Sequence, residues 1–398
     1  MSRLFSSLFP AGMHGYSDLG FLLLLCPLAA AVISASGKAR ARAAALLRAI
    51  ACASGFAVAW GCALEFLARS SSSLTVFTAA EIPIAGSWTI TPSLILDPFS
   101  ALVGTALFVA MTARSILDVM RGKRADSSGH ERLELPWLLF VPAAAAVYSG
   151  DAIQTAAPLG LAACLLGATT ATRNNEKPTF LTIPAVAAAV LPALIGVPLV
   201  ARLVGTSNAT ILSSADVLSF LDNARVFGLS ASAFAATWLV GLVGFMFAAT
   251  THFRRSNGVA DSVFTALPTA CIAAAFIIKL GPLMLSAWRS ALPVGEVSAA
   301  AAAAAAGVIM VAAVVQGRRA KPARNAEPAE PVPAPAPRPY ETGEPARAAP
   351  FPSPVPDSEN RTFRIQFEPY LVHLIIAAAL LLFALSLLGT FLAGGATQ

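Results

Sequence analysis

The chain has 398 residues, of which 57% are hydrophobic and only 12% are charged. Soluble globular proteins are about 45–50% apolar and about 25% charged, so this composition excludes a soluble globular protein. The apolar residues fall in runs of about 18–26, the length that a helix needs to cross a bilayer. We therefore expect an all-α fold, a polytopic helix bundle integral to a membrane. The net charge of +6 is spread over short loops between apolar runs, which argues against nucleic-acid binding.

The apolar runs predict about ten transmembrane helices. The first run is followed, not preceded, by basic residues, so we interpret it as a retained helix and not as a cleaved signal peptide. The fourth run is short and contains Pro142. The expected helices cover residues 19–36, 43–67, 94–119, 135–148, 152–172, 180–204, 227–251, 263–285, 297–315 and 370–392.

The basic residues of the loops alternate between the two sides of the membrane. Loops after the odd-numbered helices carry most of them, whereas the other side has little more than Arg3, Arg69, Arg225 and Arg289. The positive-inside rule then places both termini outside, in the periplasm where the chain lies in the inner membrane of a cell with two membranes. The loops after the odd-numbered helices hold Lys38, Arg40, Arg42, Arg121, Lys123, Arg124, Arg132, Arg173, Lys177, Arg254, Arg255, Arg318, Arg319, Lys321 and Arg324.

Two segments outside the apolar runs have a distinctive composition. Residues 69–92 are rich in serine and β-branched residues, which predicts a small external hairpin. Residues 321–360 are rich in proline and alanine and predict an extended chain without a core. We therefore divide the chain into a membrane body (residues 1–316), a disordered cytoplasmic linker (317–362) and a C-terminal transmembrane segment (363–398).

Ionisable residues at membrane depth are costly and are the first place to look for function. Three are candidates for an ion path: Glu65, Asp97 and Lys279. Glu65 is also placed to pair with Arg69 at i,i+4. Asp97 precedes Pro98 and is placed to cap the third helix. Lys279 lies in the outer half of the eighth helix, where it either extends to the headgroups or is buried in an ion pair, for which Glu65 is a candidate partner.

The remaining polar residues favour structural roles. Arg114 and Asp118 are spaced to form a local ion pair, Asp151 is placed to cap the fifth helix, and His373 is expected at the interface. The five cysteines fall inside apolar runs without metal-site spacing. No catalytic, cofactor-binding or metal-binding motif is present in the sequence, so at most the chain is a membrane subunit of an enzyme.

The start of the third helix carries the most specific motif. A stretch with the sequence Gly86-Ser-Trp88-Thr-Ile leads into Leu96-Asp97-Pro98-Phe99-Ser100-Ala101-Leu102, and a charged turn follows at residues 114–122. This region resembles the antiporter-like membrane subunits of proton-pumping NADH-quinone oxidoreductase, specifically the subunit L (mitochondrial subunit 5) family, which is related to subunits of multi-subunit sodium/proton antiporters. Residues 158–166 and 261–271 show weaker similarity to later helices of that family.

The residues that the resemblance would make responsible for proton transfer are missing. The helix-five glutamate of the family would fall near Ala157, and the span 227–251 has no lysine. The helix-eight histidine is replaced within residues 265–269, and only Lys279 keeps a basic group near a family position. The later helices of the family are absent, and the linker and one apolar segment stand in their place. The resemblance thus implies a truncated relative with a dismantled proton path.

Three functional hypotheses follow. The first is a non-pumping, antiporter-like membrane subunit of a respiratory or other ion-translocating complex, whose partners are other membrane subunits and the lipid bilayer. The second is a stand-alone transporter for an ion or small solute. The third is a membrane scaffold that recruits a partner through the proline-rich linker.

The loop charges give a first testable prediction. A cysteine at Ser353 should resist a membrane-impermeant thiol reagent added to intact cells, and a cysteine at Ser72 should react with it, because the two residues are expected on opposite sides of the membrane. Labelling at both positions before and after permeabilisation measures this. Reaction of the Ser353 variant in intact cells would contradict the predicted orientation.

Overall fold

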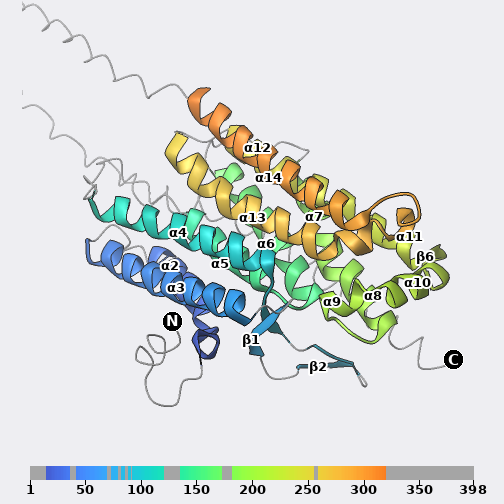
Figure 1. Cartoon of the computed structure of the whole chain (residues 1–398). Coiled ribbons are helices and arrows are strands. Elements are labelled where there is room, and N and C mark those ends of the chain that lie inside the picture. Colours follow the sequence, from blue (N-terminus) through green and yellow to red (C-terminus); the bar gives the residue numbers. More distant parts are fainter. Residues whose placement is uncertain are drawn as a thin grey trace, which may run out of the picture.

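The computed structural model describes residues 15–35, 42–69, 73–78, 82–85, 88–90, 92–120, 135–172, 182–254 and 259–319. These residues form a bundle of long helices with short strands at one end (Figure 1). Eight helical segments in this part of the chain are long and apolar enough to cross a membrane, and α5 (Leu135–Tyr148) is a shorter apolar helix beside them. The expected all-α membrane bundle is confirmed. The tenth expected helix, the linker and His373 lie outside the described residues.

The helices follow the sequence predictions closely. Both α5 and α6 begin and end at the expected residues. The helices are η1 (Tyr16–Leu19), α2 (Leu22–Ala35), α3 (Arg42–Arg69), α4 (Pro98–Met120), α5 (Leu135–Tyr148), α6 (Ala152–Thr172), α7 (Thr182–Leu191), the π-turn η2 (Pro192–Gly196), α8 (Val197–Val204), α9 (Ala209–Leu212), α10 (Ala215–Asn223), α11 (Ala231–Ala236), α12 (Trp238–Arg254), α13 (Val259–Met284), η3 (Ser286–Trp288) and α14 (Val294–Arg319).

Four expected helices need correction. The third helix begins at Pro98, not at residue 94, because Ser93–Leu96 forms strand β4. The sixth expected helix is interrupted by the π-turn Pro192–Gly196, since Pro198 has no N–H to donate to the carbonyl four residues earlier. The seventh expected helix begins at Ala231, not at residue 227, because Phe227 and Gly228 form a turn with positive φ, and it is divided into α11 and α12. The last described helix extends to Arg319, three residues beyond the expected end of the membrane body.

The small hairpin predicted for residues 69–92 is present, extends to Leu96 and consists of two antiparallel pairs. Strand β1 (Leu74–Thr78) pairs with β4 (Ser93–Leu96), and β2 (Ile82–Ala85) pairs with β3 (Trp88–Ile90). Val76 of β1 and Leu94 of β4 are buried, so the pair formed by β1 and β4 packs on the bundle.

Backbone bonds bring three loops to the end of the bundle that carries these strands, here called the strand end. The N–H of Gly150 donates to the carbonyl of Ser93 (2.9 Å), and the N–H of Ala152 donates to the carbonyl of Ser207 (2.8 Å). Two helical spans separate residue 93 from residue 150, and two more separate residue 150 from residue 207, so the chain returns to the same end of the bundle each time. This is the alternation of sides that the loop charges predicted for these helices.

Residues 205–226 at the strand end had no predicted structure, and residues 227–230 were wrongly assigned to the seventh helix. The segment 205–230 contains α9, α10 and a small hairpin of β5 (Arg225–Val226) and β6 (Leu229–Ser230). Phe227 and Gly228 both have positive φ, as a two-residue type I′ turn requires. The side chain of Asn208 accepts from the N–H groups of Thr210 and Ile211 and so caps α9.

Helix α13 lies at the centre of the bundle. It packs against α4, α5, α6, α12 and α14, and 72% of its membrane span is buried, compared with 22% for α14. Small residues make this close packing possible. Gly281 of α13, for example, lies against the side chain of Ser298 on α14.

Candidate functional site

The N-terminus of α4 is held by a reciprocal cap. The Oδ1 atom of Asp97 accepts from the N–H of Ser100, and the Oγ atom of Ser100 accepts from the N–H of Asp97, both at 2.7 Å. Pro98 occupies the first helical position, where its missing N–H costs nothing. The expected role of Asp97 as a helix cap is confirmed.

Lys279 is buried at the strand end and does not extend to the surface. Its side chain is 6% exposed, and its ammonium group donates to the carbonyl of Ser149 in the turn between α5 and α6. The Nζ atom also lies 3.9 Å from Oδ2 of Asp97. Of the two alternatives left open by the sequence, the structure therefore supports the buried ion pair.

Glu65 is not the partner of Lys279. Its carboxylate pairs with Arg69, as the i,i+4 spacing predicted, and it accepts from the N–H (2.9 Å) and the hydroxyl (3.1 Å) of Ser17. These bonds tie the end of α3 to η1. The suggested pair of Glu65 and Lys279 was wrong, because Asp97 is the carboxylate that reaches the ammonium group.

The turn between α5 and α6 is fixed by Asp151. Its Oδ1 atom accepts from the N–H groups of Ile153 (2.7 Å) and Gln154 (3.1 Å), and the hydroxyl of Ser207 donates to Oδ2. Burial raises the pKa of this carboxyl, and the hydrogen bonds from Ser207, Gln154 and Ile153 oppose that rise. The expected cap is confirmed, and it holds the turn that offers the Ser149 carbonyl to Lys279.

A second buried ion cluster lies at the opposite end of the bundle. Asp118 forms the expected pair with Arg114 (3.3 Å), and it also lies 3.9 Å from Arg48 of α3. The Arg48 guanidinium is fully buried, donates to the hydroxyl of Ser34 on α2 (3.2 Å) and lies over the ring of Trp137 on α5. The sequence analysis missed Arg48, although an arginine six residues inside a long apolar helix is a signal for a buried partner.

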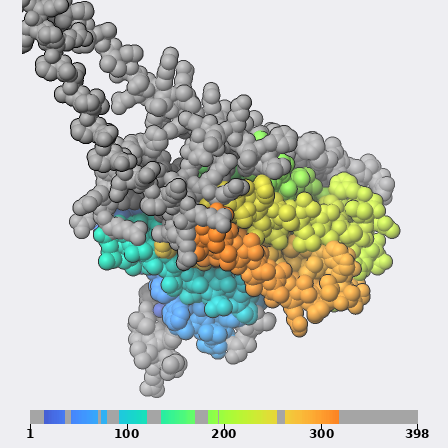
Figure 2. All heavy atoms as spheres, turned by 90° about the horizontal axis from the view of Figure 1, so that it is seen from above, coloured from blue at the N-terminus to red at the C-terminus, as the bar shows by residue number. Residues whose placement is uncertain are grey.

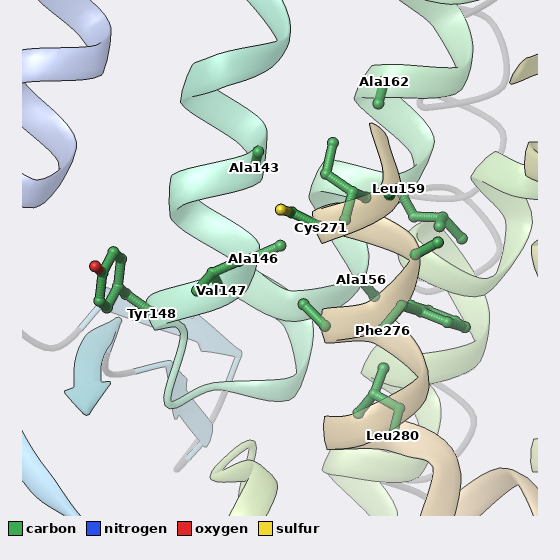
Figure 3. Close-up of a cluster of buried hydrophobic side chains, with 14 of the residues drawn as sticks. Ala143, Ala146, Val147, Tyr148, Ala156, Leu159, Ala162, Cys271, Phe276 and Leu280 are labelled. Atoms are coloured by element: carbon green, nitrogen blue, oxygen red, sulfur yellow. The ribbon is translucent and has the colours of Figure 1, made fainter. Parts of the chain in front are cut away.

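An apolar layer separates the two ends. In the part of the chain that the structure describes, the buried Lys, Arg, His and acidic side chains all lie toward one end or the other. Figure 3 shows the packing between them, where α5, α6 and α13 meet through small and apolar side chains. These include Ala143, Ala146, Ala156, Leu159, Ala162, Cys271, Phe276 and Leu280, each at most 4% exposed.

Two threonine hydroxyl groups within this layer are bonded to their own helices, whereas the buried hydroxyl groups of Tyr148 and Thr112 make no hydrogen bond to a described residue. Thr105 donates to the carbonyl of Ala101 and Thr269 to that of Thr265, both at 2.7 Å. A hydroxyl that donates to its own backbone has its proton committed, so these two groups offer few free partners to a water chain.

Comparisons with known proteins and a search for metal sites do not identify a family or a cofactor. No protein-family model matches the chain, and no similar sequence is found among curated proteins. Among the described residues, no group of three or more His, Cys, Asp and Glu side chains is arranged to hold a metal ion.

The contacts of Asp97 predict two separable effects on stability. Asp97→Ala should lower the free energy of unfolding by about 0.5–2 kcal/mol more than Asp97→Asn does, because asparagine also caps helices. Combining Asp97→Asn with Lys279→Met in a double-mutant cycle should give a coupling energy of about 0.5–3 kcal/mol. Denaturant unfolding in mixed micelles measures both, and additive effects would show that the ion pair contributes nothing.

The second ion cluster predicts a larger loss. Asp118→Asn removes the charge that faces two arginines in a buried site and should cost about 3 kcal/mol. Asp222→Asn is the matched control, because Asp222 pairs with Arg289 at 2.7 Å with both side chains about a third exposed. That change should cost about 1 kcal/mol or less. Equal losses for the two variants in the same unfolding assay would contradict the buried role of Asp118.

Proposed function

We propose that this chain is a membrane subunit of a larger ion-translocating complex, similar to the antiporter-like subunits of NADH-quinone oxidoreductase, and that it does not move protons by itself. In this proposal the protein lies in a cell inner membrane with both termini in the periplasm. Its ionisable residues hold the two ends of the bundle together, and translocation belongs to other subunits.

The apolar layer is the observation that carries the proposal. A proton path through helices needs titratable or water-holding groups spaced across the membrane. On α13 the distance from Lys279 to Phe264, whose ring lies under Arg114, is 15 residues or about 22 Å of helix. Between these two residues α13 carries only alanine, leucine, isoleucine, phenylalanine, proline, one cysteine and two threonines, of which Thr269 donates to its own helix.

The positions suggested by the resemblance support the same reading. Ala157, near the place of the family's helix-five glutamate, is an exposed apolar residue on α6. Thr269, within the stretch that replaces the family's histidine, is fully buried and donates to Thr265. Neither residue can exchange a proton near neutral pH.

Reconstitution tests the absence of proton transport. The purified chain in liposomes that contain a pH-sensitive dye should give no more proton flux than protein-free liposomes, and a protonophore serves as the positive control. Flux that disappears in the double variant Asp97→Asn/Lys279→Met would overturn the proposal and favour the stand-alone transporter.

Purification from native membranes tests the membership of a complex. A tagged chain, extracted in mild detergent, should migrate with other integral membrane subunits on a native gel and carry them through a second purification step. Weak crosslinking before extraction controls for dissociation. Migration at the size of the chain alone under both conditions would reject the subunit role.

A further inference from the structure

Helix α14 has one face that no described residue covers. Ser298, Ala302, Ile309 and Ala313 are buried against the bundle, whereas the opposite side is open, with Val308, Val311 and Val315 being 53%, 62% and 40% exposed. Figure 2 shows the orange surface of this helix lying open at the side of the bundle. At 100° per residue, the open residues Ala300, Ala304, Gly307, Val308, Val311 and Val315 share one face of the helix.

The composition of this face differs from that of other exposed surfaces of the bundle. Exposed positions on α2 and α4 carry large side chains such as Leu25, Leu28, Leu102 and Ile116. The open face of α14 carries alanine, glycine and valine. Small side chains allow another helix to approach closely in a membrane, whereas lipid chains need no such space.

Gly307 also indicates that another helix packs on this face of α14. An added Cβ atom at Gly55, Gly104, Gly241 or Gly244 would meet a neighbouring element within 3.0 Å, so each of these glycines lies at a contact between helices. At Gly307, in the middle of α14, nothing lies within 4 Å; among the described glycines this holds otherwise only for Gly295, in the first turn of α14, and for the turn glycines Gly205 and Gly228. Glycine destabilises a helix relative to alanine, so its presence on the open face is explained if a further helix packs there.

We propose that residues 370–392 of the same chain pack on this face as a transmembrane helix antiparallel to α14. The sequence continues directly from the end of α14, and residues 370–392 are the one apolar run of membrane-spanning length after that helix. Because α14 and this run are joined through residues 320–369, the second helix must enter from the side where α14 ends. The covalent link also raises its effective concentration above that of any separate chain.

Photo-crosslinking in the full chain tests this proposal. A benzoylphenylalanine replaces Val311, a site for a specific protease is inserted after Gly343, and different epitopes mark the two ends. After irradiation of membranes, cleavage is carried out in denaturing detergent. We expect a fraction of the chain to keep its full length and both epitopes. The probe at Leu102 on α4, which is 74% exposed, is the control and should give complete separation.

Each other outcome identifies a different occupant and overturns the proposal. A product of twice the mass means a second copy, an adduct with another protein means a neighbouring subunit, and complete separation at Val311 with no protein adduct means lipid.

A second variant tests the contact independently. Gly307→Leu should reduce the Val311 product, whereas Gly295→Leu, about a third of a turn away around the same helix, should not. An unchanged product in both would place the contact elsewhere.

This inference is independent of the proposed function. The crosslink reports on packing within one chain, and the flux and purification assays report on transport and assembly. Failure of either leaves the other intact.

Discussion

The burial of one ammonium group determines the arrangement of the strand end. Removing Lys279 from water costs several kcal/mol unless oxygen atoms replace its hydration. Those oxygens come from the carboxylate at the start of α4 and from a carbonyl in the turn between α5 and α6. Both acceptors must be held in place, and this is achieved by the cap formed by Asp97 and Ser100 and by the bonds that Asp151 accepts from its own turn and from Ser207. The charge thus connects three parts of the chain, because Lys279 lies 130 residues from Ser149 and 182 residues from Asp97 in the sequence.

At the opposite end of the bundle a buried carboxylate is neutralised by cationic side chains. There a single carboxylate, Asp118, faces two arginines, and the Arg48 guanidinium adds a hydroxyl and an aromatic ring as further partners. Aromatic rings attract cations most strongly where water is excluded. Helices α2, α3, α4 and α5 all contribute to this cluster, so the first half of the bundle is fixed at both ends while its centre is held by apolar packing alone.

The sequence was sufficient for features that depend on neighbouring residues. The caps of Asp97 and Asp151, the pairs Glu65–Arg69 and Arg114–Asp118 and the bounds of α5 and α6 follow from local spacing and from runs of apolar residues. The partner of Lys279 and the role of Arg48 depend on which helices pack together, which local spacing does not contain. The structure of residues 205–230 was missed because elements of two to nine residues leave no periodic signal, although Asn208 and the Phe227–Gly228 turn mark them.

A group that transfers protons must change its hydrogen-bond partners during each cycle. This requirement distinguishes a proton-transferring residue from one that only holds helices together. Lys279 binds two fixed acceptors, Glu65 binds Arg69 and two groups of Ser17, and Asp151 accepts three bonds from its own end of the bundle. If Lys279 or Asp151 left these partners, buried polar atoms at the strand end would be unpaired. The arrangement stabilises one geometry of the bundle and opposes a second one. A subunit that supplies a rigid body to a larger assembly benefits from such a geometry, whereas alternating access depends on two.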